Sequence, residues 1–178
     1  MGLLSLAIWT PVLFGVLLLA MGGDKRDVGA VRWLALLGSV AGLAVTVPLY
    51  TGFETGSAAM QFAERVLWVP AFNIHYHLAI DGISLWLVLL TAFINVIVVL
   101  ASWEVIQERV NQYMGAFLIL SGLMIGVFSA QDAMLFYIFF EATLIPMYLI
   151  IGVWGGPNKI YAAFKFFLYT LLGSLLML

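Results

Sequence analysis

The sequence predicts an all-α protein, a polytopic transmembrane helix bundle with six membrane spans. Hydrophobic residues make up 65% of the 178 residues and charged residues only 9%, a composition that soluble domains do not have. Six apolar stretches, each long enough to cross a bilayer, follow one another between more polar segments. We expect a single membrane domain over residues 1–178, with spans at about 3–21, 31–50, 82–105, 113–128, 133–153 and 160–178.

Basic residues gather in alternate connections between these spans. The first span lacks the positive start of a signal peptide, so we expect it to be retained. Positive residues mark the cytoplasmic side of a membrane protein, which predicts a periplasmic N-terminus. The connections after spans one, three and five hold Lys25, Arg26, Arg32, Arg109 and Lys159, whereas the even-numbered connections hold only Arg65.

Residues 51–77 are expected to form a long polar loop. His75 and His77 lie two apart, a spacing that places both on one face only in an extended segment. Because no cysteine or carboxylate cluster accompanies them, plain surface histidines are favoured over a metal site. Asp81 and Asp132 each precede an apolar span, where an N-cap is favoured over a proton-entry role.

Two features inside the spans suggest contacts between helices. Gly122 and Gly126 have the spacing at which small residues let another helix backbone approach closely. Asn95 lies within an apolar span and suits a packing role across helices better than ion binding.

Several classes of function are excluded or disfavoured by composition. The chain has no cysteine, so disulfides, thiolate metal sites and thiol catalysis are excluded. It has no basic cluster that would favour nucleic acid. We therefore expect the lipid bilayer and other membrane proteins as its partners, and no nucleic acid.

The fifth span carries Glu141 near its middle, and this carboxylate is the principal candidate site. A charge at that depth is costly and normally faces a protein interior or a water-filled cavity. Pro146 has no N–H, so the Ala142 carbonyl loses its usual helical partner and leaves a place for water. Tyr137 and Tyr148 fall near the same helix face as Glu141. The alternative is a carboxylate that only holds helices together.

The sixth span carries Lys165, flanked by Tyr161 and Tyr169 at four-residue spacing. Lys165 is the second candidate, as a proton-transfer group or charge partner. It lies near the start of its span, so it could instead extend to the membrane surface. Coupling between Glu141 and Lys165 through water is expected rather than a direct salt bridge.

Three runs of sequence resemble a known family: HLAIDGISLWLVLLT at 77–91, LFYIFFEATLIPMYLIIGVWG at 135–155 and KFFLYTLLGSLLML at 165–178. They resemble the antiporter-like proton-translocating subunits of respiratory complex I, most closely the chain M (subunit 4) type. The pattern F-x-E-x-x-L-x-P-M-Y, ahead of W-G, is the specific part. Mrp-type sodium/proton antiporter subunits share a looser version.

The resemblance implies proton transfer and a chain matching the N-terminal third of the family. Glu141 would match the helix-five glutamate that interacts with a helix-seven lysine, a residue beyond Leu178. Lys165 would match a lysine found at the start of helix six. NADH, FMN, iron–sulfur clusters and quinone would bind other subunits, with no cofactor in this chain. The other membrane-arm subunits would be partners, and the bacterial inner membrane the location. A Mrp-type antiporter or membrane-bound hydrogenase subunit, or a purely structural fragment, remains the alternative.

Overall fold

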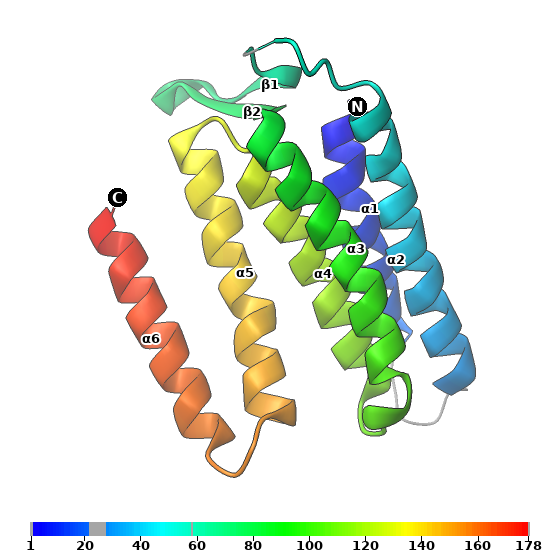
Figure 1. Cartoon of the computed structure of the whole chain (residues 1–178). Helices are drawn as coiled ribbons and strands as arrows, with labels where there is room; N and C mark the ends of the chain where they lie inside the picture. Colours follow the sequence, from blue (N-terminus) through cyan, green and yellow to red (C-terminus); the bar gives the residue numbers. More distant parts are fainter. Residues whose placement is uncertain (1, 22–27, 58, 178) are drawn as a thin grey trace.

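The computed structural model describes residues 2–21, 28–57 and 59–177. It contains six helices that run alternately up and down, each long and apolar enough to cross a membrane, as predicted (Figure 1). Their bounds are α1 Leu3–Ala20, α2 Val28–Thr51, α3 Gly82–Val105, α4 Val110–Ser129, α5 Ala133–Trp154 and α6 Lys159–Met177.

Two aspartates begin α3 and α5, in agreement with the predicted N-caps. The Asp81 carboxylate accepts hydrogen bonds from the backbone N–H groups of Ile83 and Ser84. Asp132 accepts from the first N–H groups of α5 in the same way. The Ser84 N–H lowers the pKa of Asp81 below its ordinary value. Each carboxylate thus satisfies donors that have no partner within the helix.

Glycines allow α4 to pack closely against helices on two sides. A Cβ added at Gly122 would lie 2.5 Å from the Ile8 carbonyl oxygen of α1. One added at Gly126 would lie 2.7 Å from the ring of Phe139 on α5. Both glycines permit a close approach, as predicted, but Gly122 contacts α1 whereas Gly126 contacts α5. Helix α4 therefore forms the centre of the bundle.

Helices α1 to α4 pack against one another, whereas α5 and α6 have fewer neighbours within the chain. In Figure 1, α5 and α6 extend to one side, and α6 packs chiefly against α5. Two clusters of buried apolar side chains lie along α1, one near each end of the helix. Most large apolar side chains of α6, by contrast, are exposed.

The expectation that residues 51–77 form a loop was wrong for most of that segment. Strands β1 (Gln61–Val69) and β2 (Ile74–Ile80) form an antiparallel hairpin, with the short 3-10 helix η1 (Pro70–Phe72) at its turn. Asn73 has a positive φ of 54°, which an asparagine tolerates at a tight turn. The segment is more polar than the spans, which favoured a loop. Most residues of its two strands are half-buried or exposed, so they lack the continuous apolar run of a buried strand.

The hairpin lies across the end of the bundle at which α1 begins (Figure 1). Hydrogen bonds hold it there. The His75 N–H donates to Asp132 Oδ2 at 3.1 Å, and the Gln131 N–H donates to the His77 carbonyl at 2.8 Å. The His75 contact is the main cause that lowers the pKa of Asp132. Both histidines are half-buried rather than plain surface residues, and their backbones connect the hairpin to the α4–α5 turn.

Glu64 of β1 caps α1, a role that the sequence did not suggest. Its carboxylate accepts hydrogen bonds from the N–H groups of Gly2, Leu4 and Ser5 at 2.9–3.1 Å. The Ser5 hydroxyl donates to the same carboxylate. A carboxylate from a distant strand thus occupies the positive end of the α1 dipole.

Candidate functional site

Glu141 lies on the side of α5 that faces α6. The Ser174 hydroxyl of α6 donates a hydrogen bond to Glu141 Oε1. The phenol of Tyr137, one turn earlier on α5, interacts with both the Glu141 carboxylate and the Ser174 hydroxyl. Glu141 is half-buried and Ser174 is buried. The three side chains form a compact polar cluster, named here the Glu141 cluster, between otherwise apolar helices.

Between this cluster and the α5–α6 turn, the interface of the two helices is aromatic and apolar. The Tyr148 ring makes edge-on contacts with Phe164 and Phe167 of α6, at centroid distances of 5.8 and 5.7 Å. A Cβ added at Gly152 would lie in ordinary contact with Ala163, at 3.7 Å. Tyr137, Glu141 and Tyr148 therefore follow one another along the α6-facing side of α5.

Lys165 lies on a different side of α6 from Ser174. Its Nζ lies 5.0 Å from the centroid of the Tyr161 ring and 6.0 Å from that of Tyr169, distances suited to cation–π contacts. Tyr161 and Tyr169 are 65% and 67% exposed. Lys165 and Ser174 are nine positions apart on α6, which is about 13 Å along the axis. The structure does not bring Lys165 to Glu141.

Pro146 lines a groove on a side of α5 that Glu141 does not line. A groove of about 500 Å³ lies between α1, α4 and α5, and Ala142 and Pro146 are in its wall. Ala116 of α4 and Leu19 of α1 line the same groove. Pro146 itself is buried. The groove therefore passes Ala142 and Pro146 on the side of α5 that faces α4.

Ser174 is the residue of the Glu141 cluster that sequence reasoning missed. Ala163, Phe167, Thr170 and Ser174 recur at spacings of four, three and four, which places them on one face of α6. Small and hydroxyl side chains on one face are typical of helix–helix contacts in membranes. That pattern predicts a contact face, but it does not specify the partner.

The Glu141 cluster combines one carboxylate with two hydroxyl groups. A carboxylate can take up and release a proton, and a serine or tyrosine hydroxyl can both donate and accept hydrogen bonds. Donated hydrogen bonds favour the charged carboxylate, so their loss or gain changes its affinity for a proton. Among the described residues, no group of three or more His, Cys, Asp or Glu side chains could hold a metal ion.

Two family models match the chain in adjoining parts. Residues 45–129 match the amino terminus of NADH-ubiquinone oxidoreductase chain 4. Residues 130–178 match the NADH:quinone oxidoreductase/Mrp antiporter transmembrane family. The junction falls at the start of the α4–α5 turn, so the second match covers the Glu141 cluster.

Similar proteins extend the match to nearly the whole chain. NADH-quinone oxidoreductase subunit M from Rhodobacter capsulatus is 48% identical over 99% of this chain and 34% of the relative. NADH-ubiquinone oxidoreductase chain 4 from Chondrus crispus is 44% identical over 98% of this chain and 35% of the relative. The chain thus spans about a third of the length of these relatives.

A solved structure also shares this fold. A chain of respiratory complex I from Thermus thermophilus, solved with bound NADH, matches with a TM-score of 0.81 and 30% identity. The match covers 97% of this chain and 33% of that one. By its sequence and its fold, the chain belongs to the subunit M (chain 4) family, the antiporter-like membrane subunits of respiratory complex I.

Proposed function

We propose that this chain is part of a proton-translocating membrane subunit of NADH:quinone oxidoreductase, with Glu141 as its proton-transfer group. The observation that carries the proposal is the placement of Glu141 at the α5–α6 interface, hydrogen-bonded to Ser174 and next to Tyr137. A carboxylate held at this depth in a membrane marks an ion or proton pathway by default.

The proposed mechanism is a change in the proton affinity of Glu141. In one state the Ser174 hydroxyl and nearby donors stabilise the carboxylate, and the proton lies elsewhere on the pathway. In the other state those donors turn away or a cation withdraws, and the carboxylate takes up a proton. A two-state change of this kind can link proton transfer to a distant event. Lys165, outside the cluster, would act as a charge partner for a group that approaches the outer face of α6.

The redox chemistry is assigned to other subunits. NADH, FMN, iron–sulfur clusters and quinone are proposed to bind elsewhere in the complex, and the membrane-arm subunits are the proposed partners. Tyr148, Tyr161, Tyr169 and Pro146 are proposed to support the site through packing. A Mrp-type antiporter or a membrane-bound hydrogenase is the alternative setting, since one of the two matching models also describes the Mrp antiporters.

The proposed location is the bacterial inner membrane, with the N-terminus in the periplasm. Arg32, Arg109 and Lys159 lie at the end of the bundle opposite the hairpin, whereas Arg65 lies in the hairpin. Lys25 and Arg26, which also support this orientation, lie outside the described residues. Positive residues at one end of a bundle favour the cytoplasmic side for that end.

The test is substitution of Glu141 in the full-length protein within its complex. Glu141→Gln keeps the shape and removes the titration, so we expect a large loss of NADH oxidation and of coupled proton pumping in a complex that still assembles. Glu141→Asp should keep part of both activities. The matched control is Asp132→Asn, which weakens the charge at the start of α5, worth roughly 0.3–1 kcal/mol, and the hydrogen bond from the His75 N–H. It leaves the Glu141 cluster intact, so its effect on pumping should be mild. Near-normal pumping by assembled Glu141→Gln complex would make the carboxylate structural.

A further inference from the structure

Helices α2 and α3 lie side by side, on the far side of the bundle from α5 and α6 (Figure 1). Each carries a stripe of exposed large apolar side chains at helical spacing. The stripe of α2 includes Trp33, Leu37, Val40 and Val47. The stripe of α3 includes Trp86, Phe93, Ile97 and Leu100. These eight residues are named here the α2–α3 outer face.

A pair of aromatic rings lies at each end of this face. Trp33 and Trp103 meet edge-on with ring centroids 5.5 Å apart, and at the hairpin end Tyr50 and Trp86 meet at 5.7 Å. The pairs are 17 positions apart on each helix, from 33 to 50 and from 86 to 103, which is about 25 Å along the axis. Trp and Tyr rings gather at the two boundaries of a hydrocarbon core about 30 Å thick. The two pairs are thus separated by nearly the thickness of that core.

Charged side chains occur only beyond the ring pairs. Residues 33–50 and 86–103 contain no Asp, Glu, Lys or Arg. Arg32 directly precedes Trp33, and Glu104 directly follows Trp103. The charges therefore end at the same depth as the rings, which is expected where headgroups give way to hydrocarbon.

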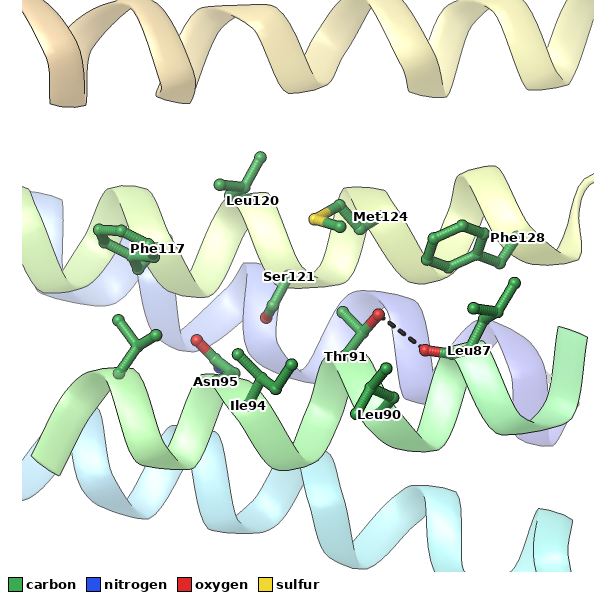
Figure 2. A pocket seen from close by; sticks show the side chains of 11 residues that line it. Leu87, Leu90, Thr91, Ile94, Asn95, Phe117, Leu120, Ser121, Met124 and Phe128 are labelled. Atoms are coloured by element: carbon green, nitrogen blue, oxygen red, sulfur yellow. Dashed lines mark hydrogen bonds between the residues drawn. The ribbon is translucent and has the colours of Figure 1, made fainter. Parts of the chain in front are cut away.

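The small and polar side chains of the two helices face other helices instead. A Cβ added at Gly38 of α2 would lie 2.7 Å from the Cβ of Phe14 on α1. On α3, Thr91 and Asn95 lie on the side toward α4 (Figure 2). Contacts between membrane helices are enriched in small and hydrogen-bonding residues. The α2–α3 outer face consists of large apolar and aromatic side chains, so it lacks the features of a helix–helix contact.

We propose that the α2–α3 outer face is a lipid-contact surface of the assembled complex, covered by phospholipid acyl chains and by no other polypeptide. The two ring pairs then lie at the headgroup boundaries of the two leaflets. Fluid acyl chains adapt to any arrangement of large apolar side chains, whereas a second helix needs a closely packed surface. The proposal rests on the proposed membrane location but not on the role of Glu141.

Photoreactive phospholipids test the occupant in native membranes that hold the full-length protein within its complex. Phosphatidylethanolamine with a diazirine midway along one acyl chain is incorporated, and mass spectrometry locates the adducts. We expect adducts on Val40, Phe93 and Ile97, and none on Val88 and Val99, which are fully buried on the inner side of α3. A diazirine near the headgroup should shift the adducts toward the ring pairs.

The labelling separates failure of this proposal from failure of the membrane location. Adducts elsewhere on the chain but none on the α2–α3 outer face would overturn the proposal and leave the membrane location standing. No adducts anywhere on the chain would contradict both.

Two enlarging substitutions test the same face without a probe. Ile97→Phe adds volume on the outer face and should leave the melting temperature of the assembled complex nearly unchanged, because acyl chains rearrange around the larger ring. Val99→Phe is the matched control, since a closely packed interior does not accept the added atoms. It should lower the melting temperature or prevent assembly. A marked fall with Ile97→Phe would show that protein covers this position and would overturn the proposal.

Discussion

The hydroxyl of Ser174 on α6 donates a hydrogen bond to the carboxylate of Glu141 on α5, across 33 positions of sequence. This contact gives the intramembrane carboxylate a defined partner within the chain. It also sets the rotation of α6, since a helix that turns Ser174 toward α5 turns Lys165 elsewhere.

Ser174→Ala removes the donor and keeps the packing, so the Glu141 carboxylate should lose its hydrogen bond from α6. A hydrogen bond to a charged group contributes about 1.5–3 kcal/mol. We therefore expect the rate of coupled proton pumping by the full complex to fall while the complex still assembles. Thr170→Ala is the matched control, because that hydroxyl donates to the Phe166 carbonyl of its own helix at 2.8 Å. Equal pumping rates for the two variants would argue against a role for Ser174.

Lys165 and Glu141 should act independently, since they lie on different sides of the α5–α6 pair. We expect the effects of Lys165→Met and Glu141→Gln on pumping, expressed as free energies, to add within about 0.3–0.5 kcal/mol. The measurement is a double-mutant cycle on proton pumping in assembled complexes. Glu141→Asp replaces Glu141→Gln if the latter leaves no measurable rate. A larger coupling energy would mean that the two charges meet in a state other than the one described.

Gly122→Ala should destabilise the protein, because the added Cβ would meet the Ile8 carbonyl oxygen at 2.5 Å. Separating α1 from α4 should cost about 1–3 kcal/mol, as in other overpacked interiors. Gly173→Ala is the control, because nothing lies within 4 Å of a Cβ built there. Thermal unfolding of the full-length protein in detergent should show a lower melting temperature for Gly122→Ala alone. An unchanged temperature would show that α1 and α4 separate without cost.

The orientation in the membrane can be read by labelling, because the chain has no native cysteine. Cysteines at Glu54 and Phe72, both exposed and at the hairpin end, should react with an impermeant thiol reagent added to intact cells. Cysteines at Glu108 and Asn158, at the opposite end, should react only after the membrane is opened. The reverse pattern would place the N-terminus in the cytoplasm.

The sequence alone determined the six spans, their order and the helix-start residues Asp81 and Asp132. These features follow from local properties, namely runs of apolar side chains and short-range hydrogen bonds at a helix start. The cost of a charge within an apolar run likewise singles out Glu141 from the sequence. What the sequence left open was the rotation of each helix about its axis and the identity of its neighbours.

Those choices were made by tertiary structure. Only the packing of α6 on α5 paired Glu141 with Ser174 and left Lys165 between two exposed tyrosines. Only the folded hairpin brought Glu64 to the start of α1, some 60 positions away. Hydropathy cannot predict such pairings, because an apolar side chain on a membrane helix has nearly the same free energy of transfer whether it faces lipid or another helix. Their arrangement is decided by close packing and by the few polar groups that need a partner.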